Sequence, residues 1–291
     1  MPAHLVDTVT DYLNLAEAHS AVTWTKRKLL SLKAPDGSRF PDRPDIERIL
    51  NTRWFRGQAR DRPLVPKVYR NKYDEQEMLM QVRRQAALMP DLPPETETVH
   101  WYFTLQHHGF PTRLLDWTES ALVALFFAVE KWAEYTQQRR KMSPVVWVIN
   151  PFAMNWVLRK TSIIPGTSTD EAVYDGSGKV HVGVGRSDIE AAWTGSKAAR
   201  PPLAIASTYV HVRMQVQSSR FTVHGQSRTD LRKLFEKSGL LASGFARAIR
   251  IDPDAAEELF LKLQKIGISR SMLFPGLDSI SRQFDETYRL R

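Results

Sequence analysis

The longest apolar run in the chain, ALVALFFAV over 121–129, limits most strongly what this sequence can fold into. It has about half of the roughly 18 to 20 residues that a membrane-spanning helix requires. A segment that is apolar on every side predicts a helix buried in the core of a folded protein. We expect this helix over 119–135, with Thr118 or Ser120 as its N-cap.

The composition is typical of a folded protein and excludes several kinds of site. The chain has 291 residues, of which 42% are hydrophobic, so it can bury the core of one large domain or two small ones. Because there is no Cys, disulfide scaffolds, thiolate zinc sites and Cys nucleophiles are excluded. The first residues carry acids and no apolar block, unlike a secretory signal, so we expect a cytoplasmic protein without a membrane partner.

The net charge of +9 and the excess of Arg over Lys, 27 to 14, indicate an anionic partner. The planar guanidinium suits phosphate and carboxylate groups better than an ammonium does. Nucleic acid, a dinucleotide and an acidic protein all fit this description. A basic surface without a specific partner is an interpretation that stays equally open.

The spacing of apolar residues and chain breakers predicts a mixed α+β fold, because strands and helices do not alternate regularly enough for a doubly wound sheet. We expect a largely antiparallel sheet with packed helices. Helices are expected over 3–32, 73–89, 98–108, 119–135 and 252–267 and after Pro275, and strands over 52–58, 144–151, 209–225 and 245–251, with 34–45 as a loop and 112–118 as a strand or extended turn.

Capping residues and glycines refine these boundaries. Thr98 and Asp252 are expected as N-caps of their helices, and Gly109 as the left-handed residue that ends the helix over 98–108. Residues 1–50 are expected to form a helical N-terminal extension and loop, and residues 51–291 the main domain. Within that domain, the Gly-rich residues 163–202 are expected to form an insertion or a mobile lid.

The motif FRGQ ends the first expected strand, and its Arg56 has two possible roles. An Arg that projects from an apolar wall is either paired with a buried acid or free to hold an anion. Gly57 would let the backbone approach a ligand closely. Considered alone, the motif favours the structural pair.

Two further segments combine Arg with an acid or an amide. In TRLLDW, Arg113 and Asp116 lie three residues apart and therefore on opposite faces of a regular strand. In RMQVQSSRF, Arg213, Gln215 and Gln217 are expected to share one strand face. Burying such polar side chains without hydrogen-bond partners costs free energy. We therefore expect these two segments and FRGQ to converge on one cleft, where their polar groups can find partners.

The adjacent His107 and His108 are expected in the last turn of the helix over 98–108, where the negative end of the helix dipole favours imidazolium. Their side chains point about 100° apart, so they seldom bind one ion together. The eight His of the chain include no pair at the i, i+4 spacing and no HExxH motif. We therefore expect no metal site.

Four segments carry a resemblance to a known family: FRGQ, QHHGFPTRLLDWTESALVALFFAV, RMQVQSSRFTVHG and KLQKIGISRSMLFPGLDSI. Together they resemble the FRG domain family, named for its Phe/Tyr-Arg-Gly motif, over about Trp54 to Phe284. The long central block is the most specific part. This family is found largely in bacteria and phages, which implies an effector in phage–host conflict.

The aromatic-Arg-Gly motif on an early strand is also similar to the first motif of Arg-type ADP-ribosyltransferases, whose Arg helps to fix NAD. The similarity implies an NAD-using enzyme. A late strand of those enzymes supplies a Glu beside an oxocarbenium-like ribose. The comparable segment here carries Gln217 and no acid, so the carboxylate would come from Asp116, Glu119 or Glu77.

The leading hypothesis is therefore an ADP-ribosyltransferase-like enzyme with NAD as cofactor. Arg56, assisted by Arg113, would clamp the diphosphate, Asp116 would stabilise the developing cation or orient an Arg, and Gln217 would contact a ribose hydroxyl. His107 or His108 would hydrogen-bond a ribose or act as acid and base. The expected catalytic residues are Arg56, Glu77, His107, His108, Asp116 and Gln217, and the expected ligand-binding residues are Gly57, Gln58, Thr112, Arg113 and Arg213.

Two other interpretations stay open. The positive charge and the excess of Arg also fit a non-catalytic module that binds nucleic acid. The polar segments could instead be core staples that saturate one another. A nucleic acid or a protein could each be the acceptor of an enzyme of this kind.

Overall fold

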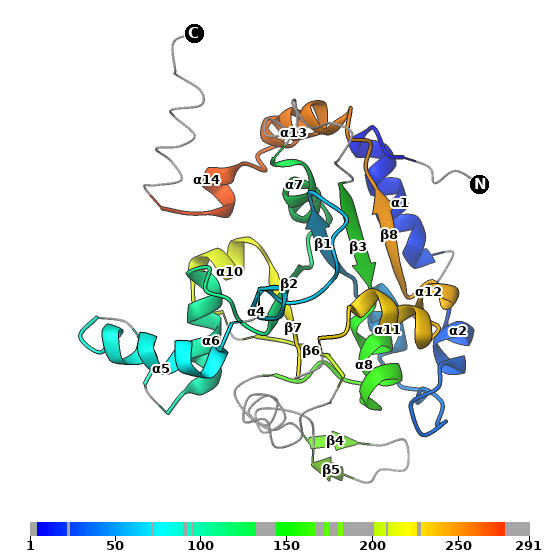
Figure 1. Cartoon of the computed structure of the whole chain (residues 1–291). Helices are drawn as coiled ribbons and strands as arrows, with labels where there is room; N and C mark the ends of the chain where they lie inside the picture. The colour runs from blue at the N-terminus through cyan, green and yellow to red at the C-terminus, as the bar shows by residue number, and fades with distance from the viewer. Residues whose placement is uncertain are drawn as a thin grey trace.

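The fold was analysed in a computed structural model (Figure 1). The structure describes residues 5–21, 24–71, 73–89, 92–94, 96–131, 144–166, 172–174, 180–182, 201–207, 209–225 and 228–276.

A six-stranded sheet forms the centre of the fold, in the order β6-β7-β2-β1-β3-β8. Each neighbouring pair is antiparallel, which confirms the predicted α+β class with an antiparallel sheet. A separate two-stranded hairpin consists of β4 and β5. The strands are β1 Trp54–Gln58, β2 Leu114–Thr118, β3 Val145–Ile149, β4 Ala172–Tyr174, β5 Val180–Val182, β6 Leu203–Ile205, β7 Ser219–Val223 and β8 Ala246–Arg250.

Helices connect and cover these strands, and α5 and α6 lie at one end of the molecule (Figure 1). The helices are α1 Val9–Ala21, α2 Lys26–Ser31, α3 Ile46–Asn51, α4 Lys67–Arg70, α5 Glu75–Ala86, α6 Thr98–His107, α7 Ala121–Val129, α8 Pro151–Arg159, α10 Val212–Val216, α11 Leu231–Lys237, α12 Leu240–Ser243, α13 Ala256–Lys265 and α14 Arg270–Leu273.

The apolar run forms α7, a buried helix as predicted. Ser120 is its N-cap, and the Ser120 hydroxyl accepts a hydrogen bond from the Val123 amide at 3.3 Å. The helix lies directly on β1, because a Cβ built on Gly57 would come within 1.8 Å of the Ala124 carbonyl oxygen. Residues 132–135, the rest of the helix expected here, lie outside the described residues.

Gly57 therefore serves the packing of α7 on the sheet. Gly57 also lines the cleft on β1 and β2, and its role beside a ligand stays a prediction. Side chains alternate between the two faces of a strand. The neighbours Arg56 and Gln58 consequently project from the face of β1 that α7 does not cover.

The N-terminal segment shares its core with the sheet. The Val6 amide donates to the Arg250 carbonyl at 3.0 Å, and the Tyr12 hydroxyl donates to the Ala121 carbonyl at 2.7 Å. The single helical stretch expected over 3–32 is two helices, α1 and α2. The loop expected over 34–45 is confirmed.

The strand expected over 209–225 is wrong in its first half, where residues 212–216 form the short helix α10. Gln217 ends this helix, and Ser218 has a φ of 46°, so the chain turns before β7 begins. The alternation of polar and apolar residues was too short to distinguish a strand from one helical turn. Arg213, Gln215 and Gln217 therefore do not form a stripe on one strand face.

Two predicted N-caps are also wrong. Glu97 occupies the capping position of α6, and the Thr98 hydroxyl accepts a hydrogen bond from Arg83 instead. A turn over 253–255 separates Asp252 from α13. The left-handed Gly109 at the end of α6 is confirmed, with a φ of 78°.

Other expectations fall largely outside the described residues. The helix expected after Pro275 would lie mostly in 277–291, and most of the Gly-rich stretch 163–202 is likewise not described.

Candidate functional site

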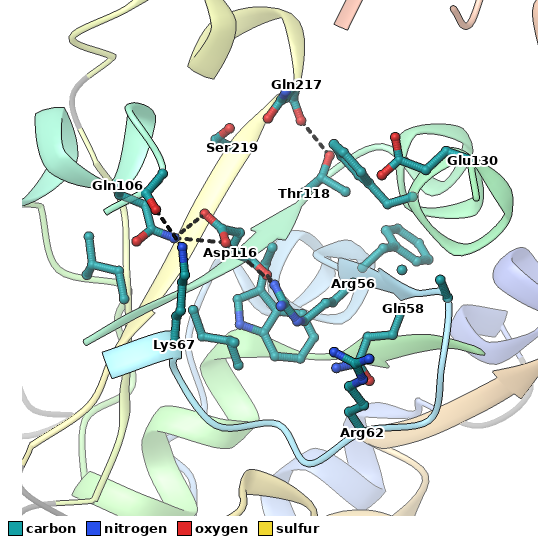
Figure 2. Close-up of a pocket in the computed structure, with 18 of the residues that line it drawn as sticks. Arg56, Gln58, Arg62, Lys67, Gln106, Asp116, Thr118, Glu130, Gln217 and Ser219 are labelled. Carbon is teal, nitrogen blue, oxygen red and sulfur yellow. Dashed lines mark hydrogen bonds and ion pairs between the residues drawn. The ribbon is translucent and has the colours of Figure 1, made fainter. Parts of the chain in front are cut away.

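A cleft of about 530 Å³ opens on the face of β1 and β2 that carries Arg56. The loop after β1, α4, the end of α6 and the turn around α10 complete its walls (Figure 2). Among the described residues, seven cations and two acids line the cleft, which gives an excess of five positive charges. The cations are Arg56, Arg60, Arg62, Lys67, Arg70, Lys131 and Arg213, and the acids are Asp116 and Glu130.

Arg56 and Asp116 form the floor of this cleft, and β1 and β2 bring them together as neighbouring strands. The Arg56 Nη1 donates to the Asp116 backbone carbonyl at 2.5 Å and lies 3.7 Å from the carboxylate. The Arg56 side chain is 16% exposed, whereas the Asp116 side chain is 54% exposed. Burial lowers the pKa of Arg56, and the Asp116 charge opposes this shift. Because guanidinium groups titrate far above neutral pH, Arg56 stays charged.

Gln106 holds the Asp116 carboxylate in place. Its Nε2 lies 2.8 and 2.9 Å from the two carboxylate oxygens. The Thr112 hydroxyl donates to the Gln106 Oε1, and the Leu114 amide donates to the Thr112 hydroxyl at 3.2 Å. This chain of donors fixes which end of the Gln106 amide faces Asp116, so the carboxylate is ordered although it is exposed.

Gln106 was not among the residues that sequence reasoning selected, and Thr112 was expected to bind a ligand. Thr112 is fully buried beneath Gln106 and does not line the cleft in the described part of the chain. One feature of the sequence could have indicated this contact. Gln106, Thr112 and Asp116 belong to the same block, QHHGFPTRLLDW, and its Gly-Phe-Pro turn brings the two halves of the block together.

Gln58 and Gln217 add amide groups to the cleft from opposite sides (Figure 2). The Gln58 Oε1 is buried and has no hydrogen-bond partner among the described residues. The Gln217 Nε2 donates to the Leu273 carbonyl at 2.9 Å, and its backbone carbonyl accepts from the Thr118 hydroxyl at 2.6 Å. The Gln58 acceptor is thus unused by the described residues, whereas the Gln217 amide is engaged by α14.

Arg113 forms a buried ion pair with Glu75 and therefore has a structural role. Its Nε lies 2.5 Å from the Glu75 Oε2, and its backbone amide donates to the Glu75 Oε1 at 2.7 Å. Burial raises the pKa of Glu75, and the Arg113 charge acts in the opposite direction. Neither residue is part of the lining of the cleft. Sequence reasoning missed Glu75, which is the first residue of α5 and lies far from Arg113 in the chain.

Glu77 lies apart from the cleft, on the exposed side of α5. Its carboxylate accepts a hydrogen bond from the Gln81 Nε2 at 2.8 Å. The sequence had offered it as one source of a catalytic carboxylate. In the structure, Asp116 is the acid at the floor of the cleft, and Glu130 lies at its rim.

His107 and His108 form an imidazole cluster with His211, beside the cleft. The His107 and His211 rings stack with their centroids 4.0 Å apart. Burial, followed by the charges of His211, Arg213 and His108, lowers the pKa of His107 to about 4. Burial and the neighbouring positive charges thus act against the charged form of His107 that the helix dipole favours. Neither His107 nor His108 lines the cleft in the described part of the chain.

Arg213 does line the cleft, and its position depends on two neighbours. Its Nη1 donates to the His107 carbonyl at 3.1 Å, and its guanidinium lies 4.2 Å from the centre of the Phe274 ring. Burial lowers the pKa of Arg213, and the charge of Asp116 raises it. Arg213, Arg56 and Asp116 all line the same cleft.

Helix α14 and the following Phe274 contact several residues that line the cleft. Arg270 pairs with Glu130 at 2.9 Å, and Phe274 packs edge-on against Phe127 with ring centroids 6.0 Å apart. Leu273 is fully buried, and its backbone carbonyl accepts the hydrogen bond from the Gln217 side-chain amide. Four cleft residues, namely Phe127, Glu130, Arg213 and Gln217, are thus held by the segment over 270–274.

Two classes of site find no support in the described residues. No group of three or more His, Cys, Asp or Glu there could hold a metal ion. The helices described there include none with the length and apolar character that crossing a membrane requires.

The comparison with protein families gives one match. Residues 51–137 match the family model of the FRG domain. This range contains β1, α4, α6, β2 and α7, and with them Arg56, Gln106 and Asp116. No curated protein and no solved structure matches the chain.

Proposed function

Because residues 51–137 match the FRG domain family model and supply the floor of the cleft, we propose that the cleft binds NAD and cleaves its nicotinamide–ribose bond, transferring ADP-ribose to an acceptor. One observation carries this proposal. An exposed, ordered carboxylate, that of Asp116, lies at the floor of a cleft whose walls are otherwise strongly cationic.

The cationic walls suit the diphosphate of a dinucleotide. Arg56 and Arg213 are both partly desolvated and face the same space as Asp116. Guanidinium groups bind phosphate oxygens through paired hydrogen bonds, which are stronger where water is excluded. The free Gln58 Oε1 can accept a hydrogen bond from a ribose hydroxyl or from the nicotinamide amide.

The Asp116 carboxylate provides the charge that the reaction requires. When the bond between nicotinamide and the ribose C1′ breaks, nicotinamide leaves with the bonding electron pair and positive charge develops on the ribose. A fixed carboxylate stabilises this charge without reorganising during the reaction. An acceptor hydroxyl, amine or water then forms the new bond to C1′ and loses its proton to solvent.

The proposal differs from the roles expected from the sequence most clearly at Arg113 and His107. Arg113 belongs to a buried pair with Glu75 and takes no part in binding the diphosphate. His107, with a pKa of about 4, is neutral at pH 7 and serves to hold Arg213 through its backbone carbonyl. The carboxylate of this site comes from β2, whereas ADP-ribosyltransferases take it from a late strand.

The test is nicotinamide release from NAD by the whole chain and by an Asp116→Asn variant. Asparagine keeps the shape and removes the charge, so we expect activity to fall about a hundredfold or more with little change in melting temperature. Asp254→Asn, in an exposed turn next to α13, is the matched control and should leave activity unchanged. Absence of release by the unaltered chain, together with no heat in a calorimetric titration with NAD, would falsify the proposal.

The alternative of a non-catalytic nucleic-acid module gives a different result for Arg56. A binder that neutralises many phosphates shows a steep salt dependence and loses little when one Arg is removed. The proposed enzyme should lose most of its activity with Arg56→Gln at constant salt. Strong oligonucleotide binding that is indifferent to Arg56, without nicotinamide release, would favour the nucleic-acid module.

A further inference from the structure

Arg62 and Arg70 form a second cationic group in the cleft, on the loop after β1 and on α4. Both side chains are exposed. Neither makes a salt bridge or a side-chain hydrogen bond with any described residue. They differ in this from Arg56, which is engaged by Asp116. Two guanidinium groups that face a cleft and have no acidic partner can both bind an anion.

The two guanidinium groups act on each other electrically. Burial lowers the pKa of Arg70 first, the positive charge of Arg62 lowers it further, and Asp116 raises it. Arg70 in turn lowers the pKa of Arg56. All three Arg line the same cleft, and Asp116 is the carboxylate that acts on both Arg56 and Arg70.

Lys67 adds a third positive charge to the group formed by Arg62 and Arg70, which is the outer cationic group of the cleft. Its Nζ donates to the Gly109 carbonyl at 2.7 Å, a contact that orders the ammonium without neutralising it. The loop after β1 and α4 thus supply Arg62, Lys67 and Arg70 to one side of the cleft, and Figure 2 shows Lys67 and Arg62 on the two flanks of Arg56.

The outer group exceeds what a diphosphate needs. A dinucleotide diphosphate carries one negative charge on each of its two phosphates, whereas the described lining of the cleft has an excess of five positive charges. Three positive charges would therefore remain unbalanced beside such a ligand, and Arg62 and Arg70 have no acid partner among the described residues. A phosphate monoester carries about 1.5 to 2 negative charges at neutral pH and three acceptor oxygens, which suits two exposed guanidinium groups.

We propose that Arg62 and Arg70 form a second phosphate subsite, so that the preferred dinucleotide carries a phosphate monoester in addition to its diphosphate. The inference rests on the proposed binding of a dinucleotide at Arg56 and Asp116. It names a narrower class of substrate, a dinucleotide with a phosphorylated adenosine ribose, such as NADP in place of NAD.

The experiment measures binding by calorimetry with three probes: ADP-ribose, its 2′-phosphate and the 3′-phosphate isomer. We expect one phosphorylated probe to bind about tenfold more tightly than ADP-ribose, as two added charge-assisted contacts imply. The Arg62→Gln/Arg70→Gln variant should bind all three probes equally, because it loses the preference for a phosphorylated probe. Arg27→Gln, an exposed Arg on α2, is the matched control for loss of charge.

The outcomes separate the two proposals. Equal binding of the three probes by the unaltered chain overturns the second subsite and leaves the proposed function standing. The second subsite is overturned in the same way if the double variant keeps the preference for a phosphorylated probe. If no probe binds, the proposed function falls, and the subsite falls with it. Should the double variant be less stable, Arg62→Lys/Arg70→Lys gives the same test, because an ammonium cannot form the paired contacts.

Discussion

Two Arg–carboxylate pairs lie within the same folded block and serve opposite purposes. The side chains of Arg113 and Glu75 are 7% and 4% exposed, and both Glu75 oxygens are used by the Arg113 side chain and backbone. Arg56 and Asp116 lie at 3.7 Å with Asp116 more than half exposed, and Asp116 keeps lone pairs open to the cleft. Both pairs combine an Arg with a carboxylate, from Glu75 in one and from Asp116 in the other. What distinguishes a structural pair from a site is whether its hydrogen-bonding capacity is used up inside the protein.

The largest expected effect is on stability, and it tests whether the two Arg–carboxylate pairs differ. Arg113→Ala leaves Glu75 buried without its cation, so the free energy of unfolding should fall by about 3 to 5 kcal/mol. Arg56→Ala, the matched variant in the open pair, should cost about 1 kcal/mol or less, because Asp116 remains solvated. Urea denaturation of both variants measures the difference. Equal losses would show that the two pairs are of one kind.

The next effect is on activity, and it tests whether the open pair of Arg56 and Asp116 is a catalytic site. Gln106→Leu removes the donor that orders the Asp116 carboxylate, so we expect kcat for nicotinamide release to fall about tenfold while KM for NAD stays nearly constant. Gln81→Leu removes a similar hydrogen bond, from Gln81 to Glu77 on α5, and should change neither value. A change in KM alone would assign Gln106 to substrate binding. Unfolding of the Gln106→Leu variant would place it with the structural pair.

The smallest effect concerns the imidazole cluster. The pKa of His107, at about 4, lies below its ordinary value near 6.5. The folded state therefore favours the neutral ring, and this contribution to stability is present above about pH 6.5 and is lost as the pH falls toward 4. Because the ring is partly exposed, we expect about 1 kcal/mol. His107→Gln should flatten the fall in melting temperature between these pH values, and an unaltered slope would contradict the assignment.

The sequence was sufficient for the elements with strong local signals. The apolar run with Ser120 before it predicted α7, and FRGQ predicted β1, because burial and capping act within a few residues. The division of roles between Arg56 and Arg113 could not be predicted. It depends on Glu75, which is 38 residues from Arg113 and reaches it only through the packing of α5.

The imidazole cluster and α10 illustrate the same limit. His211 meets His107 because residues 212–216 form a helix, where the alternating pattern had predicted a strand. The Gln106 amide was overlooked since nothing in its own helix marks it, and its importance comes from Asp116 across the Gly-Phe-Pro turn. Residues that make a site through contacts between elements leave no periodic signal along the chain.

The strand order has a practical consequence for anyone who would produce the matched family segment by itself. Among the described residues of 51–137, only β1 and β2 are sheet strands, and they pair at a single position, Phe55 opposite Thr118. The strands with which they pair more extensively, β3 and β7, come later in the chain. A recombinant fragment cut at those limits would expose two unpaired strand flanks and invite self-association in the test tube. The sheet that holds these two strands extends beyond the residues that the family match covers.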